Sequence, residues 1–161
     1  MEMNDSGKNK SSEILQLVSF RVNKEEYAID ILKVKEIIKV INITQVPNTD
    51  DFIEGVINLR GSIIPVVALR TKLGMPKKEP DKDTRIIVVE IDDKVIGFIV
   101  DAVNEVLRIS SDLTEKTPEF ISNVNMEFIS SVAKLENRLL ILLDLNKIFS
   151  KKEKHALENA A

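Results

Sequence analysis

The side chains that most often perform catalysis are scarce in this chain. It contains one histidine, His155, and no cysteine among 161 residues. A serine or threonine nucleophile would therefore lack its usual imidazole base, and thiolate chemistry is excluded. The carboxylate pairs Asp50-Asp51 and Asp92-Asp93 could perform acid–base chemistry, but such pairs are common in turns and helix caps. We therefore expect that the protein is not an enzyme.

Ligands for a metal ion or a phosphate-bearing cofactor are equally scarce. One histidine, no cysteine and no loop of alternating acidic residues leave only weak calcium or magnesium sites possible. The five glycines form no glycine-rich phosphate-binding motif. We expect no cofactor and no metal.

The polar turn Asn58-Leu59-Arg60-Gly61, between two apolar runs, carries the most unusual charge. A guanidinium between two β-branched strands must pair with an anion, remain in water or contact another protein. We weigh two roles for Arg60, a structural salt bridge with Glu36 and a contact with a partner protein. Both can hold, because an arginine already held by a carboxylate loses less entropy on docking. Gly61, and Asn137 at the corresponding point of the second half, suit a tight turn with positive φ.

The composition favours a β-rich aliphatic core and excludes two classes of partner. Hydrophobic residues make up 43% of the chain but aromatic residues only 4%, so β-branched aliphatic side chains must fill the interior. The net charge of −3 arises from well-mixed acidic and basic residues, which leaves no basic stripe for nucleic acid. No apolar run approaches the roughly 20 residues that cross a bilayer, so we expect no direct membrane insertion. The absence of cysteine suits a cytoplasmic protein.

The elements that must position these residues follow a duplication. Placed on each other, the two halves of the chain match at several points: Tyr27-Ala28-Ile29 with Ile96-Gly97-Phe98, Val34 with Val103, Glu36 with Glu105, Ile37-Ile38 with Val106-Leu107, and Ile63 to Leu69 with Leu139 to Leu145. Each half alternates as strand, turn, strand, short helical turn, strand, loop, and two strands closed by a short helix. Asp30 can cap a helical turn on which Ile31, Val34 and Ile37 share one face.

Five short strands in each half are too few for an open sheet with both faces buried, so each half is expected to curl into a small barrel. The polar stretch 77–83 separates a first lobe of about 14–76 from a second lobe of about 83–150. We expect the two barrels to lie side by side and to stabilise each other. The polar segments 1–12 and 151–161 are expected to be mobile or loosely packed tails.

Three spaced motifs make the chain resemble the CheW family of bacterial chemotaxis coupling proteins from about Ile14 to Phe149. The motifs are Tyr27-Ala28-Ile29-Asp30-Ile31-Leu32-Lys33-Val34-Lys35-Glu36-Ile37, the turn Asn58-Leu59-Arg60-Gly61, and Val95-Ile96-Gly97-Phe98-Ile99-Val100-Asp101. The resemblance implies a mainly β fold of two five-stranded, SH3-like barrel lobes with a few short helices. It also implies a cytoplasmic adaptor that joins chemoreceptors to the CheA histidine kinase in a ternary signalling complex at membrane-associated receptor arrays.

The resemblance further implies that the boundary between the lobes binds the helical tip of a chemoreceptor through an apolar face. The matching positions in this sequence are Val18, Ile31, Val34, Ile37 and Val103. The alternative is that these residues are core, since apolar stripes are more often buried than docked.

A second surface, on the first lobe, is implied to dock the regulatory domain of the CheA kinase. The matching residues are Ile43, Thr44 and Val46, on a strand that ends at Pro47, together with Asn58, Arg60 and Gly61, while Glu36 has a structural or orienting role. The alternative for the strand residues is an ordinary sheet edge, where a proline limits further pairing.

A different function stays open beside the adaptor. A small barrel protein could bind an oligonucleotide or a translation factor, and it would then present basic and aromatic residues on one face. This acidic chain without tryptophan offers little of either.

Overall fold

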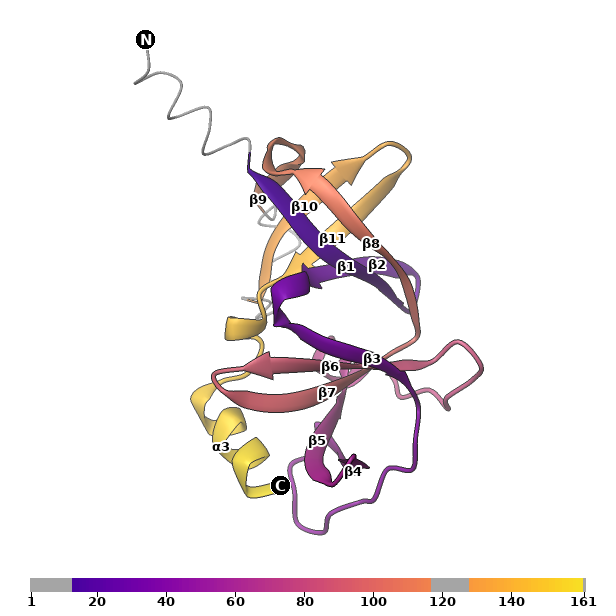
Figure 1. Cartoon of the computed structure of the whole chain (residues 1–161), viewed down its shortest axis with the longest axis vertical. Coiled ribbons are helices and arrows are strands. Elements are labelled where there is room, and N and C mark those ends of the chain that lie inside the picture. The colour runs from indigo at the N-terminus through magenta and orange to yellow at the C-terminus, as the bar shows by residue number, and fades with distance from the viewer. Residues whose placement is uncertain (1–12, 117–127, 161) are drawn as a thin grey trace.

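The computed structural model describes residues 13–116 and 128–160, and it is a two-lobed, mainly β molecule (Figure 1). The expected N-terminal tail, 1–12, lies outside the described residues. No described helix is long and apolar enough to span a membrane. The prediction of a mainly β fold with two lobes and a few short helices is confirmed.

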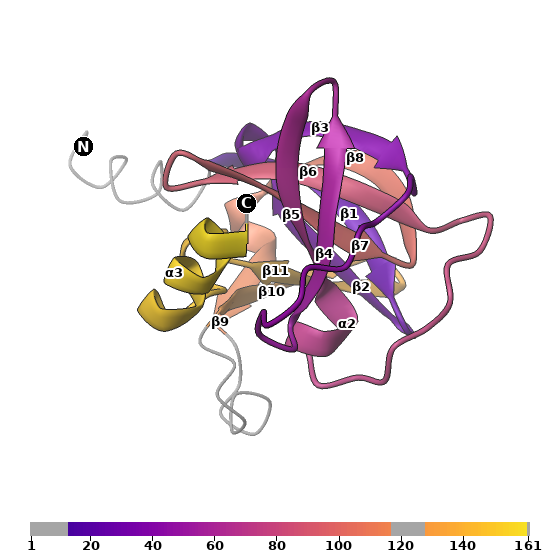
Figure 2. The ribbon, with the colours of Figure 1, turned by 90° about the horizontal axis from the view of Figure 1, so that it is seen from below.

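Each lobe is built on one curled sheet (Figures 1 and 2). Lobe A has the strand order β8-β1-β2-β11-β10-β9, and lobe B has the order β3-β6-β7-β5-β4. Neighbouring strands are antiparallel except for the pairs β2–β11 and β5–β7. The strands are β1 (Ile14–Val22), β2 (Glu25–Asp30), β3 (Val34–Lys39), β4 (Ile53–Leu59), β5 (Ser62–Ala68), β6 (Arg85–Ile91), β7 (Lys94–Val100), β8 (Ala102–Ser110), β9 (Thr114–Lys116), β10 (Ile129–Leu135) and β11 (Arg138–Leu143). The helices are η1 (Ile31–Lys33), α2 (Leu69–Lys72), η2 (Ser111–Leu113), η3 (Leu145–Lys147) and α3 (Lys151–Ala160).

The two lobes do not follow the two halves of the sequence. In Figure 1 the indigo strands β1 and β2 lie in the same sheet as the orange strands of the second half. Lobe A therefore combines 14–30 with 102–116 and 129–143, and lobe B is formed by 34–100. The expected lobe bounds, about 14–76 and about 83–150, are wrong. Both repeats carry the same local pattern, and that pattern does not specify which sheet a strand joins.

The helical stripe expected over Ile31, Val34 and Ile37 is also wrong beyond its first turn. Asp30 caps η1 as predicted, since its Oδ1 accepts the N–H of Leu32 at 2.9 Å, but β3 begins at Val34. The register of β3 shifts between Val34 and Glu36, which places Val34 opposite Val89 and Ile37 opposite Ile87. A β-bulge of this kind brings residues three apart onto one face, so the spacing imitates a helix.

The C-terminal segment is a helix that packs on the molecule and not a loose tail. Leu157, only 2% exposed, and Ala160 join the large hydrophobic core. Three ion pairs accompany this packing: Lys72–Glu153 at 2.9 Å, Lys94–Glu158 at 2.7 Å and Lys154–Asp92 at 2.6 Å. The apolar residues lie three positions apart, so one face of a short helix is buried even in a strongly charged segment.

The hydrophobic core has three parts. A small cluster fills the interior of each lobe, around Leu140 in lobe A and Ile86 in lobe B. The largest cluster combines residues of both lobes, among them Phe20 of β1 and Phe98 of β7. Burial of this shared cluster supplies the non-directional attraction that holds the lobes together.

Candidate functional site

The edge strands β3 and β8 carry an apolar surface at the boundary between the lobes. Each is the outermost strand of its sheet, and both lie on the same face of the molecule (Figure 1). Val34 and Val103 are half-buried against the shared core. Ile37 and Val106 are exposed, at 38% and 58%. We call these four residues the edge-strand surface.

The same irregularity shapes both halves of the edge-strand surface. The register of β8 on β1 shifts between Ser19 and Phe20, so that Val103 lies opposite Phe20 and Val106 opposite Val18. Since Phe20 and Val18 both belong to the shared core, Val103 and Val106 project from that same face of the sheet. The bulges in β3 and β8 thus occur at equivalent points of the duplication.

Not all predicted receptor-contact residues are available at this surface. Val18 is 1% exposed inside the shared core and has no surface for a partner to touch, so its assignment is corrected to a core residue. Ile31 is half-buried against the same core. Sequence reasoning missed Val106, although the duplication aligns it with Ile37.

The hairpin between β4 and β5 holds the predicted arginine turn. Arg60 and Gly61 have φ of 50° and 88°, and the N–H of Gly61 donates to Oδ1 of Asn58 at 2.9 Å. Two successive residues with positive φ are typical of the tight turns that match the twist of a hairpin. Positive φ was predicted for Gly61 and Asn137, and is confirmed for both, but was missed for Arg60.

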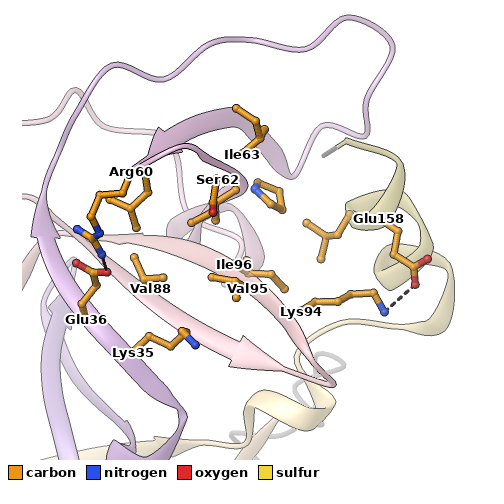
Figure 3. Close-up of a pocket in the computed structure, with 14 residues that line it drawn as sticks. Lys35, Glu36, Arg60, Ser62, Ile63, Val88, Lys94, Val95, Ile96 and Glu158 are labelled. Carbon is orange, nitrogen blue, oxygen red and sulfur yellow. Dashed lines mark hydrogen bonds and ion pairs between the residues drawn. The ribbon is translucent and has the colours of Figure 1, made fainter.

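The guanidinium of Arg60 pairs with the carboxylate of Glu36 on β3 (Figure 3). This is the salt bridge that the sequence predicted. Lobe A has an equivalent pair, because Arg138 of its hairpin lies 2.9 Å from Glu105, the duplication partner of Glu36. In each lobe an arginine–glutamate pair links the hairpin to the edge strand, while most of the Arg60 side chain remains exposed.

A pocket of about 680 Å³ lies beside this turn, between the hairpin, β6, β7 and α3 (Figure 3). Its apolar lining includes Val88, Ile96 and Leu157, and the exposed side chain of Ile63 lies at its edge. The two carboxylates that line it are both paired, Glu36 with Arg60 and Glu158 with Lys94. Hydrogen bonding to Glu158 raises the pKa of Lys94. The pocket therefore offers shape and apolar area, and no free general base.

The segment that precedes β4 is an irregular chain with one bridge to that strand. The N–H and carbonyl of Thr44 both bond Val56, at 2.9 Å each, whereas a strand ending at Pro47 was expected. Gly55 makes the approach possible, because a Cβ there would lie 2.3 Å from the carbonyl oxygen of Thr44. Ile43 and Val46 are half-buried and Thr44 is exposed.

The structure places this segment and the arginine turn along one strand. Thr44 pairs with Val56 of β4, and Asn58 lies near the end of the same strand. The predicted kinase-contact residues thus share one edge of lobe B. We call them the hairpin surface: Ile43, Thr44, Val46, Asn58, Arg60 and Gly61.

Neither surface resembles a metal site. Among the residues that the structure describes, no group of three histidine, cysteine or acidic side chains is placed to hold a metal ion.

Comparisons with known proteins agree on one family. A family model described as a CheW-like domain matches residues 16–153. The chemotaxis protein CheW of Klebsiella aerogenes is 38% identical over 146 residues, which cover 91% of this chain and 88% of that protein. The CheW protein of Bacillus subtilis is 39% identical over 136 residues, 84% of this chain and 87% of that protein. The crystal structure of the scaffolding protein TtCheW from Thermoanaerobacter tengcongensis has a TM-score of 0.79 at 39% identity and covers 86% of this chain and 94% of that one.

Proposed function

Since the chain belongs to the CheW family of chemotaxis scaffold proteins, we propose that it couples chemoreceptors to the CheA histidine kinase. Membership of a scaffold family confirms the expectation that the chain is not an enzyme. The oligonucleotide- or translation-factor-binding alternative finds no support in these relatives. The observation that carries the proposal is that one molecule presents two separate surfaces, one at the boundary of the lobes and one at the end of lobe B.

The edge-strand surface is proposed to bind the helical tip of a chemoreceptor. Its exposed residues, Ile37 and Val106, extend the shared core outward as a strip of aliphatic side chains. An amphipathic helix can cover such a strip with its own apolar face. Half-buried Val34 and Val103 support the strip from beneath and keep its shape.

The hairpin surface is proposed to dock the regulatory domain of CheA. Arg60 is already oriented by Glu36, so little side-chain entropy is lost when its exposed guanidinium meets a partner. The two surfaces share no residue, and the proposed coupling requires receptor and kinase to bind at the same time. Tethering in a cytoplasmic array at the membrane then makes modest individual affinities sufficient.

An NMR titration of isotope-labelled protein tests this proposal. A receptor-tip fragment should shift the signals of Ile37 and Val106, and the CheA regulatory domain should shift those of Thr44 and Arg60. Addition of the second partner should leave the first set of shifts in place. The proposal is refuted if neither partner shifts any signal at about 100 μM, or if both shift the same residues.

A further inference from the structure

The chain crosses from lobe B to lobe A at a single buried acidic residue. Asp101 is the one residue between β7 and β8, and only 6% of its surface is exposed. Buried carboxylates require compensating partners, because desolvation of a charge is unfavourable. The partners of Asp101 come from both lobes.

The carboxylate of Asp101 bonds lobe B through Arg70 of α2. Its Oδ1 accepts Nε of Arg70 at 2.9 Å and its Oδ2 accepts Nη2 at 2.7 Å. This two-pronged pairing restricts the angle between the groups more than a single hydrogen bond does. Arg70 is itself held, since its Nη1 donates to the carbonyl oxygen of Pro76 at 3.1 Å.

The same residue bonds lobe A through the turn between β1 and β2. Oδ2 of Asp101 also accepts the N–H of Asn23 at 2.7 Å, and the backbone N–H of Asp101 donates to the carbonyl oxygen of Arg21 at 3.0 Å. Burial favours a raised pKa for Asp101, but the hydrogen bonds from Arg70 and Asn23 outweigh it and lower the pKa. The group is therefore a charged bridge between lobes.

At the crossing from lobe A to lobe B, the described residues form no equivalent bridge. There the chain passes through η1, where the duplication aligns Leu32 with Asp101, and Leu32 is 87% exposed. Within the part of the chain that the structure describes, the carboxylate that bonds groups of both lobes thus lies on the Asp101 side of the junction. On that side Asp101 directly precedes β8 and lies two residues before Val103 of the edge-strand surface.

We propose that Asp101 and Arg70 form an interlobe clamp that positions β8 relative to β3 and thereby shapes the edge-strand surface. Both are positioning residues, because neither belongs to the surface itself. The attraction that the shared hydrophobic core supplies is non-directional, whereas the fork of Arg70 on Asp101 is directional. The consequence for partner binding rests on the proposed function, while the clamp itself does not.

Distance measurements between the lobes test the clamp directly. The chain has no cysteine, so spin labels can be attached to Lys39→Cys on β3 and Glu136→Cys in the β10–β11 turn, both exposed. Pulsed electron paramagnetic resonance then gives the distribution of distances between the two spin labels. Asp101→Asn keeps the size of the side chain but removes its charge, and Arg70→Lys keeps the charge but removes the fork. Both are expected to broaden or displace the distribution.

A matched control distinguishes the effect of breaking the clamp from the effect of breaking any part-buried ion pair. Glu153→Gln breaks the part-buried pair with Lys72, which joins α2 to α3 and does not link lobe A to lobe B. It should leave the distribution unchanged. The clamp is overturned if folded Asp101→Asn or Arg70→Lys protein keeps the parental distribution, or if Glu153→Gln broadens it equally. Arg70→Lys serves as the test should Asp101→Asn fail to fold.

Binding measurements on the same variants test the consequence. Affinity for a receptor-tip fragment should fall by about tenfold in Asp101→Asn, a typical size for coupling between sites, while affinity for the CheA regulatory domain should stay within about twofold. If the parent protein binds no receptor tip, the proposed function fails and the distances still decide the clamp. If the distances change and tip affinity does not, the clamp does not shape the surface.

Discussion

Replacement of Val106 by aspartate should strongly weaken receptor binding and leave the protein folded. The side chain is 58% exposed on β8, so the free protein should lose no more than about 1 kcal/mol of stability. Complete burial of a valine contributes about 1.5–3 kcal/mol, and the part still exposed would contribute about 1 kcal/mol on docking. An unpaired polar group buried in the interface costs about 2 kcal/mol more.

These contributions add to about 3 kcal/mol, or a loss of about 150-fold in affinity. Titration calorimetry with a receptor-tip fragment measures it. Leu139→Asp is the matched control, because Leu139 is 56% exposed and lies on β11, three strands from β8 in the same sheet. The reasoning fails if folded Val106→Asp protein binds the tip within about twofold of the parent, or if Leu139→Asp loses as much affinity.

Three further predictions concern the hairpin, the C-terminal helix and alkaline pH. Arg60→Ala should change the free energy of unfolding by less than about 1 kcal/mol, because its pair with Glu36 is largely exposed. The same variant should weaken CheA binding in a pull-down or calorimetric assay. Unchanged CheA affinity would contradict the docking role of Arg60. Leu157→Ala should lower stability in urea by about 3 kcal/mol, since this leucine is buried in the shared core; a loss below about 1 kcal/mol would mean that α3 does not pack there. Burial, aided by Glu25, raises the pKa of Tyr27 to about 12. Near pH 10 the tyrosine hydroxyl loses its proton in the unfolded chain but keeps it in the folded protein. The free energy of unfolding of the parent, relative to that of Tyr27→Phe, should therefore fall by up to about 2 kcal/mol between pH 10 and 12. A constant difference would refute the raised pKa of Tyr27.

Local patterns in the sequence were sufficient for the strands and the turns. Alternation of apolar residues located β1 and β2, and the polar turn Asn58-Leu59-Arg60-Gly61 located the hairpin, because both depend on residues near in sequence. The salt bridge with Glu36 was one of the two roles weighed for Arg60, and the structure shows it. Val106 was accessible through the duplication, as the counterpart of Ile37, and was overlooked.

Residue burial was harder to predict where it depends on strand irregularities. The bulges after Val34 in β3 and after Val103 in β8 decide which side chains share a face, and a bulge has no clear signature in the sequence. Val18 was assigned to a docking surface although it lies in the core, because an apolar strand residue does not reveal which of its faces is covered. The packing of α3 through Leu157 was missed because the segment is strongly charged and its apolar face is narrow.

By itself the sequence determined the β-rich class, the positions of most strands, the tight turns and the family resemblance, since each follows from local periodicity, backbone preference or spaced motifs. Only the tertiary structure decided that the repeats exchange strands, so that 14–30 shares a sheet with 102–116 and 129–143. It alone placed Asp101 against Arg70, which are far apart in the chain. The physical reason is that two repeats with the same local pattern offer equivalent partners, and the choice between them depends on packing across the whole molecule.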